Sequence, residues 1–184
     1  MKKIVLATAS PRRRELIKYI SDDVLCVPSG EEETLPDGIG ASETAEFLAN
    51  LKAKSVAKAY SDYIVIGCDT VVVLDNEVLS KPLSYEDAYN KLKALSGRKH
   101  RVITGCSIIS SDKEITFKEE TEVEFFTLTD EEIWEYIKTD SPMDKAGGYG
   151  IQDRGGLFVK GINGDYNNVV GLPVARLYRE LKGF

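Results

Sequence analysis

Three arginines at the start of a predicted helix are the first residues of the chain that could do chemistry. Ser10 and Pro11 are typical of a helix N-terminus, and Arg12, Arg13 and Arg14 follow them directly. Positive charge at that end of a helix is unfavourable by roughly 0.3–1 kcal/mol for each exposed group, so a bound anion would offset the cost. Backbone N–H groups, the serine hydroxyl and the guanidinium groups together predict a site for phosphate or polyphosphate. The alternative is a simple helix cap beside solvated arginines.

Asp69 is the second candidate, because it follows the apolar run 63–68 and is therefore predicted to stand where a buried strand ends. Groups that handle ligands gather at such strand ends in open sheets. Burial would raise the pKa of this carboxyl toward that of a general base, whereas a metal or a lysine would keep it ionised as a ligand. The alternative, which is favoured when Asp69 is taken alone, is a turn aspartate that opens a hairpin.

Other polar residues point to chemistry only in combination. Lys52 and Lys81 could each bind a phosphate, or each could be an ordinary surface lysine. Residues 31–33 are three glutamates, of which one could bind a metal ion. Gln152 ends a glycine-rich segment that has the spacing of neither a P-loop nor a dinucleotide fingerprint, and its amide could address the edge of a nucleobase.

Composition restricts the class of protein and of site. The 184 residues are 42% hydrophobic and 29% charged, which is the balance of a folded domain, and the net charge of −6 argues against duplex binding as the main function. His100 is the single histidine, so a metal would be held mainly by oxygen, and Mg²⁺ or Mn²⁺ is favoured over Zn²⁺. Cys26, Cys68 and Cys106 have neither zinc-site nor disulfide spacing, which favours reduced thiols in the cytoplasm. No apolar stretch approaches membrane-spanning length.

The elements that must position these residues alternate early in the chain and give way to long strands in its middle. We predict a mixed sheet flanked by helices, in a single domain over residues 1–184 that holds two lobes without a linker marked in the sequence. The predicted strands are 3–8, 24–27, 63–68, 71–74, 77–79, 101–109, 114–126 and 157–162. Helices are predicted from residue 11, over 42–60 and 84–96, from a capping box at Thr129 and Glu132, and after Pro173.

Several motifs in a fixed order resemble the Maf family of nucleotide pyrophosphatases, and together they cover nearly the whole chain. They are residues 9–13 (ASPRR), 48–49 (LA), 52–53 (KA), 67–72 (GCDTVV), 81–82 (KP), 95–97 (LSG), 142–147 (PMDKAG), 150–152 (GIQ) and 168–173 (NVVGLP). The chain departs from the family pattern at Cys68 and Gly148, where alanine is usual, and at Asp153, where glycine often follows the glutamine.

The resemblance implies a fold, an activity and a set of site residues. The fold would be the ITPase-like Maf/Ham1 α/β fold, an elongated mixed sheet flanked by helices, with two lobes around a cleft. The activity would be hydrolysis of nucleoside triphosphates to monophosphate and pyrophosphate with a divalent cation, Mg²⁺ or Mn²⁺. Asp69 would accept the proton of the attacking water and, with Glu33, bind the cation. The residues that hold the triphosphate would be Ser10, Arg13, Lys52 and Lys81, and those resembling the specificity set of the dTTP and UTP branch are Arg12, Thr70 and Gln152.

Partners and rival functions follow from the same resemblance. We expect a nucleoside triphosphate as substrate, no membrane and no nucleic-acid partner, and a homodimer is the oligomeric state left open. The rival function is that of a noncatalytic regulator of septum formation that binds nucleotide or nucleic acid. A second enzymatic alternative is a purine-directed pyrophosphatase that removes noncanonical nucleotides.

Overall fold

The fold is built on one mixed β-sheet. The computed structural model describes residues 3–184; Met1 and Lys2, which the predicted domain includes, lie outside the described residues. Seven strands form the described sheet in the order β2-β1-β3-β5-β6-β7, with β4 paired to β3. Strand β1 pairs in parallel with β2 and β3, whereas β4 and β7 pair antiparallel with β3 and β6, which confirms the mixed sheet. The strands are β1 Ile4–Ala7, β2 Val24–Val27, β3 Ile64–Leu74, β4 Glu77–Leu79, β5 Lys99–Ile109, β6 Glu114–Phe125 and β7 Val159–Asn163.

The helices follow the local signals of the sequence closely. Ser10, Ser84 and Thr129 are the N-caps of α1, α3 and α4, and Thr129 forms the predicted capping box with Glu132. The predicted strand 157–162 begins later, at Val159, because residues 154–158 form a 3₁₀ turn instead. The helices are α1 Pro11–Leu16, α2 Ala41–Ala57, α3 Tyr85–Leu95, α4 Asp130–Ile137, α5 Tyr166–Val170 and α6 Val174–Leu181.

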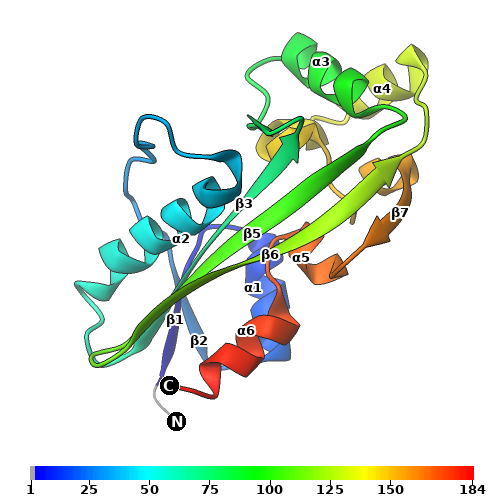
Figure 1. The fold of residues 1–184 in the computed structure, drawn as a ribbon. Coiled ribbons are helices and arrows are strands. Elements are labelled where there is room, and N and C mark those ends of the chain that lie inside the picture. Colours follow the sequence, from blue (N-terminus) through cyan, green and yellow to red (C-terminus); the bar gives the residue numbers. More distant parts are fainter. Residues whose placement is uncertain (1–2) are drawn as a thin grey trace. The chain divides into compact units, whose positions relative to one another are not determined.

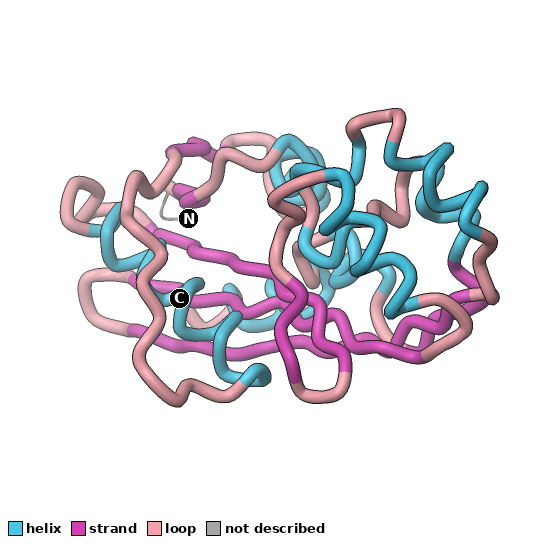
Figure 2. Tube along the Cα trace, turned by 90° about the horizontal axis from the view of Figure 1, so that it is seen from above, coloured by secondary structure: helices cyan, strands magenta, loops and turns pink. Residues whose placement is uncertain are grey.

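Two compact units divide the chain. Unit 1 comprises Met1–Thr70, Thr104–Glu119 and Gly171–Phe184, and unit 2 comprises Val71–Ile103 and Glu120–Val170. Three of the four boundaries fall inside β3, β5 and β6, which Figure 1 draws as continuous strands, and the fourth follows α5 at Val170. Figure 2 shows the strands as magenta segments of the trace. Three of the four passages of the chain between the units therefore run along strands.

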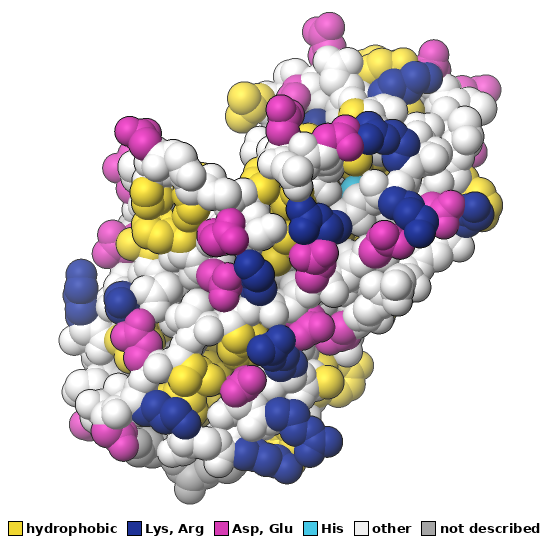
Figure 3. All heavy atoms as spheres, viewed as in Figure 1, with side chains coloured by type: hydrophobic (Ala, Val, Ile, Leu, Met, Phe, Trp, Pro, Cys, Tyr) yellow, Lys and Arg dark blue, Asp and Glu magenta, His cyan; other side chains and the backbone are white. Residues whose placement is uncertain are grey.

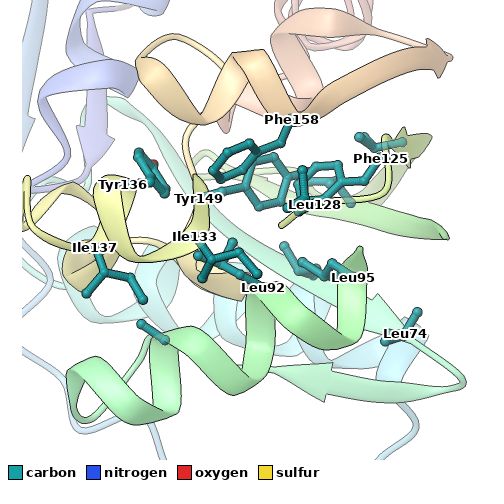
Figure 4. Packing of buried hydrophobic residues seen from close by; sticks show 14 residues of the cluster. Leu74, Leu92, Leu95, Phe125, Leu128, Ile133, Tyr136, Ile137, Tyr149 and Phe158 are labelled. Atoms are coloured by element: carbon teal, nitrogen blue, oxygen red, sulfur yellow. The ribbon is translucent and has the colours of Figure 1, made fainter. Parts of the chain in front are cut away.

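Unit 2 has an aromatic core. Phe125 lies edge-on to Tyr149, with ring centroids 4.7 Å apart, and Phe158 packs in the same manner against Tyr136 at 5.1 Å (Figure 4). Apolar side chains from α3 and α4, among them Leu92 and Ile133, complete the cluster. Buried aromatic pairs of this geometry add roughly 0.5–1.5 kcal/mol each beyond the area they bury.

Unit 1 is organised by a close approach of α2 to the sheet. Ala45, Ala49 and Ala53 are spaced four residues apart on α2 and are fully buried. A Cβ atom added to Gly67 would lie 2.6 Å from the backbone nitrogen and 2.8 Å from the Cβ of Ala53, and one added to Gly105 would lie 2.5 Å from the nitrogen of Glu46. The two glycines therefore let the helix backbone pack directly on β3 and β5.

One sequence prediction about this sheet is wrong. Asp69 and Thr70 do not interrupt a strand, because β3 runs without a break from Ile64 to Leu74, and Asp69 does not stand at a strand end. The carboxylate bonds Lys52, and the threonine hydroxyl bonds Arg13. Polar side chains with such partners can remain within a buried strand at little cost.

Charged side chains of both signs lie among one another on the face drawn in Figure 3. Ion pairs of unit 2 include Lys99 with Glu122 at 2.7 Å and Lys160 with Glu124 at 2.7 Å. Exposed pairs of this kind contribute little to stability.

Candidate active site

The start of α1 is a capped helix N-terminus. Ser10 is the N-cap, its hydroxyl accepts a bond from the backbone N–H of Arg13 at 3.4 Å, and Pro11 occupies the first turn, as the sequence predicts. The N–H of Ser10 in turn donates to the hydroxyl of Thr8 at 3.0 Å, and Thr8 is buried. The loop between β1 and α1 is thus fixed by its own side chains, which keeps the N–H groups of the helix start in place.

Arg13 is bound to the protein along one edge of its guanidinium group. Its Nε donates to the carbonyl of Gly171 at 2.8 Å and its Nη2 donates to the hydroxyl of Thr70 at 2.9 Å. These bonds use the Nε–Nη2 edge, so neither of them involves the N–H groups at the Nη1 end. Arg13 is therefore not a freely solvated arginine, and Arg12 beside it is half-buried.

Lys52 joins two carboxylates. Its Nζ lies 2.5 Å from Oδ1 of Asp69 and 2.8 Å from Oε1 of Glu33. The side chains of Lys52 and Asp69 are 13% and 12% exposed, whereas that of Glu33 is 50% exposed, so the solvent reaches the cluster from the side of the loop that carries Glu33. Three charged groups with a net charge of −1 meet at one point, where a second cation would be attracted.

The Lys52 cluster and Arg13 both contact β3, and they do so at adjacent residues. Lys52 bonds Asp69, and Arg13 bonds Thr70. Successive side chains of a strand point to opposite faces of the sheet, and the α2 face is that of Gly67 and Asp69. Thr70 and Arg13 thus belong to the other face. Strand β1 ends at Ala7, opposite Gly67, so both groups lie beside the part of β3 that extends past β1.

Lys81 and Gln152 belong to unit 2. Lys81 is exposed just after β4, and Gln152 is exposed in the turn that precedes the 3₁₀ segment 154–158. Their predicted roles in binding phosphate and base stay predictions. Within unit 1 the structure brings together two sets of predicted residues, one of Lys52, Asp69 and Glu33 and one of Ser10, Arg13 and Thr70. Arg12 lies beside the second set in sequence, in α1.

Asp153, which departs from the family pattern next to Gln152, makes its hydrogen bonds within unit 2. Its carboxylate accepts bonds from the hydroxyls of Tyr136 at 2.9 Å and Ser141 at 2.6 Å and from the N–H of Gly155 at 2.7 Å, and Lys145 lies 3.4 Å away. Burial opposes its ionisation, but these hydrogen bonds and the lysine charge outweigh burial and lower the pKa of the carboxyl. The Asp153 side chain therefore fixes the loop rather than extending toward a ligand.

Sequence reasoning did not find three residues of the site. Thr8 precedes the predicted cap, and Gly171 lies in the motif 168–173. Thr104, whose hydroxyl is 2.9 Å from that of Thr70, is a polar residue within an apolar strand. A hydroxyl in a strand as buried as β5 is the one signal that could have been noticed, since buried polar groups need partners.

The buried thiols of Cys68 and Cys106 in unit 1 are hydrogen-bonded and form no disulfide. Sγ of Cys68 is 3.5 Å from Sγ of Cys106, and burial raises the pKa of Cys106. Cys26 is also a free thiol.

Among the helices of residues 3–184, none combines the length and the apolarity that crossing a bilayer requires.

Fold and site together define a mixed α/β protein in which β3 contacts an arginine of a helix start through Thr70 and a lysine-bridged pair of carboxylates through Asp69. The chain belongs to the family described as Maf-like protein, whose model matches residues 3–184.

Relatives support this assignment over the full length. A dTTP/UTP pyrophosphatase of Bacillus cereus strain G9842 is 50% identical over all 184 residues, which is 96% of the relative, and one of Bacillus mycoides strain KBAB4 is 48% identical over the same share. Among solved structures, a HAM1 protein from Coxiella burnetii covers the whole of both chains with a TM-score of 0.53 and 13% identity. That likeness concerns the fold alone.

Proposed function

We propose that this chain hydrolyses nucleoside triphosphates, dTTP and UTP among them, to nucleoside monophosphate and pyrophosphate. Relatives named dTTP/UTP pyrophosphatase at about half identity over the whole chain support the proposal. The observation that carries it is the meeting of Lys52, Asp69 and Glu33 beside the segment of β3 that Arg13 contacts. Phosphoryl transfer needs little more from a protein than positioning and neutralisation of charge, and these groups can supply both.

In this proposal the cationic groups bind the triphosphate. The Nη1 end of Arg13 and the N–H groups at the start of α1 hold phosphate oxygens, and the Ser10 hydroxyl adds a further donor. Lys52 stabilises the negative charge that develops on the leaving pyrophosphate. Lys81 from unit 2 is proposed as an additional phosphate ligand.

Asp69 is the proposed proton acceptor. Lys52 donates to its Oδ1, and its Oδ2 has no hydrogen-bond partner among residues 3–184, so that oxygen can accept a bond from the attacking water. The water would attack the α-phosphorus while pyrophosphate leaves, and the water proton would pass to the Asp69 carboxylate.

The carboxylates fit a divalent cation that is completed by substrate. No group of three or more histidine, cysteine, aspartate or glutamate side chains that could hold a metal occurs in residues 3–184, so an all-protein cage is not supported there. Mg²⁺ commonly binds through one or two carboxylates plus substrate phosphates, and Asp69 and Glu33 already converge on one cation, the Lys52 ammonium. We propose that these two residues would hold Mg²⁺ or Mn²⁺, which would neutralise phosphate charge.

Nucleotide preference is proposed to reside in Arg12, Thr70 and Gln152, with a pyrimidine triphosphate favoured. A panel of dTTP, UTP, CTP, ITP and methylated GTP is assayed for pyrophosphate and monophosphate. The products show which phosphoanhydride bond is cleaved, and the rates show which base is preferred. Stoichiometric pyrophosphate from dTTP and UTP is the expected result. Orthophosphate as product, or intact triphosphate retained on the protein, would refute the proposal, and the second result would favour a noncatalytic regulator.

We also propose a reducing compartment, the cytoplasm, as the place of action. Cys68 and Cys106 are free thiols with sulfur atoms 3.5 Å apart, and thiols persist where glutathione keeps them reduced. Fractionation of cells with an antibody to the protein tests this, and recovery from a membrane or secreted fraction would contradict it.

A further inference from the structure

Thr104 is a buried polar residue that the proposed function does not use. It lies in β5 within unit 1 and has no exposed surface. Its hydroxyl oxygen is 2.9 Å from that of Thr70, so the two hydroxyls share a hydrogen bond between neighbouring strands. Thr70 is in turn the residue whose hydroxyl accepts a bond from Arg13.

Two points fix the direction in which Arg13 presents its guanidinium group. One is the carbonyl of Gly171, which belongs to the backbone and cannot rotate away. The other is the hydroxyl of Thr70, which can move to another χ1 rotamer unless a partner holds it. Thr104 is positioned to be that partner, so the second anchor of Arg13 depends on the hydrogen bond between the hydroxyls of Thr70 and Thr104.

We propose that Thr104 is a positioning residue for triphosphate binding: it holds the Thr70 hydroxyl and thereby aims the Nη1 end of Arg13 at the phosphates. The inference rests on the proposed function, because it assigns Arg13 to the triphosphate. The opposing view is that Thr104 only satisfies a buried hydroxyl and that its loss would weaken the fold without acting through Arg13.

Substitution of Thr104 by valine separates these views. Valine has nearly the same shape, but its methyl group would stand where an oxygen now lies 2.9 Å from Thr70, and carbon contacts prefer about 3.5–4.0 Å. The Thr70 hydroxyl would have to turn away. We expect T104V to raise KM for dTTP about tenfold and to change kcat by less than about threefold, whereas T104S, which keeps the hydroxyl, stays close to wild type.

A double-mutant cycle with Arg13→Ala is the decisive measurement. If Thr104 acts through Arg13, T104V adds nothing to KM in the R13A background. Thr44→Val is the matched control, since Thr44 is also buried in unit 1 but bonds only the carbonyl of Gly40, at 3.0 Å, among its described contacts. Should T104V fail to fold, T104A takes its place in the same cycle.

Binding of inorganic tripolyphosphate, measured by calorimetry, gives a readout that does not need turnover. Weaker tripolyphosphate binding by T104V together with no hydrolysis by wild type would refute the proposed function and support the positioning role. Unchanged KM and unchanged tripolyphosphate binding in T104V would overturn the positioning role, as would an effect of T104V that persists in full without Arg13.

Discussion

The Nζ atom of Lys52 lies 2.5 Å from Oδ1 of Asp69, although the two residues are 17 positions apart in sequence and belong to a helix and a strand. The contact exists because α2 packs on β3 over Gly67. Both side chains are nearly buried, so the pair is held in a medium where charge interactions are stronger than in water. The predictions below test what this contact and its neighbours do.

Asp69→Asn should remove most turnover, because the amide cannot accept a proton from water. General-base catalysis is worth about 10²–10⁴-fold, and we expect kcat for dTTP to fall within that range. Pyrophosphate release under saturating dTTP measures it. Glu114→Gln is the control, since Glu114 pairs with Lys54 of the same helix at 3.1 Å but is 45% exposed, and it should leave kcat unchanged. Near-normal turnover in D69N would contradict the assignment of Asp69 as the proton acceptor.

Removal of divalent cations should abolish turnover, and Glu33→Gln should raise the Mg²⁺ concentration needed for half-maximal activity by roughly tenfold, because one ligand charge is lost. Glu32→Gln is a matched control from the same exposed loop. A titration of activity with Mg²⁺ after treatment with a chelator checks both statements. Full activity in the presence of chelator, or equal Mg²⁺ curves for E33Q and E32Q, would contradict them.

Gly67→Ala should disturb the site from a distance. The added methyl group would meet the backbone of α2 at Ala53, 2.6 Å from its nitrogen, so the helix that carries Lys52 must move outward. Overpacking of this kind costs about 1–3 kcal/mol, and we expect both a lower unfolding free energy and a lower kcat. At Gly161 nothing lies within 4 Å of the added atom, so Gly161→Ala should change neither quantity. Denaturant titration measures the unfolding free energy, and steady-state kinetics measures kcat. A G67A protein indistinguishable from wild type would argue that α2 is not held in this way.

His100 should make the folded state sensitive to mild acid. Burial lowers the pKa of this histidine from 6.5 to about 4; its Nε2 lies 2.7 Å from the Tyr149 hydroxyl, and the rings of Phe125 and Tyr149 face it edge-on. Between pH 6.5 and 4 the unfolded chain binds a proton that the folded chain does not, so the stability from the neutral histidine is complete above pH 6.5 and is lost as the pH falls toward 4. The full loss is about 3 kcal/mol, of which about 2 kcal/mol falls between pH 7.5 and pH 5.

Urea unfolding of wild type and His100→Gln at pH 7.5 and pH 5 measures this effect. Glutamine has no proton to gain, so the difference between the two pH values should nearly vanish in H100Q. His100 is the single histidine of the chain, so no other imidazole can account for the change. Equal pH dependence in the two proteins would show that another group is responsible.

Local sequence determined the elements and the kind of chemistry. Ser10 and Pro11 marked the start of α1, Thr129 and Glu132 marked that of α4, and each acts through neighbours within one helical turn. The arginines next to that start were enough to predict an anion site, because the argument needs only the charge of a helix end. The order of the motifs then identified the family.

Tertiary structure alone decided how the site is assembled. The sequence predicted that a strand ended before Asp69, whereas contacts with Lys52 and Arg13 allow β3 to continue through Asp69 and Thr70. Arg13 is anchored on Gly171, 158 residues away, and Thr70 on Thr104 in another strand. Contacts between distant segments depend on strand order and on how closely a helix packs, and no pattern within a short window of sequence encodes either.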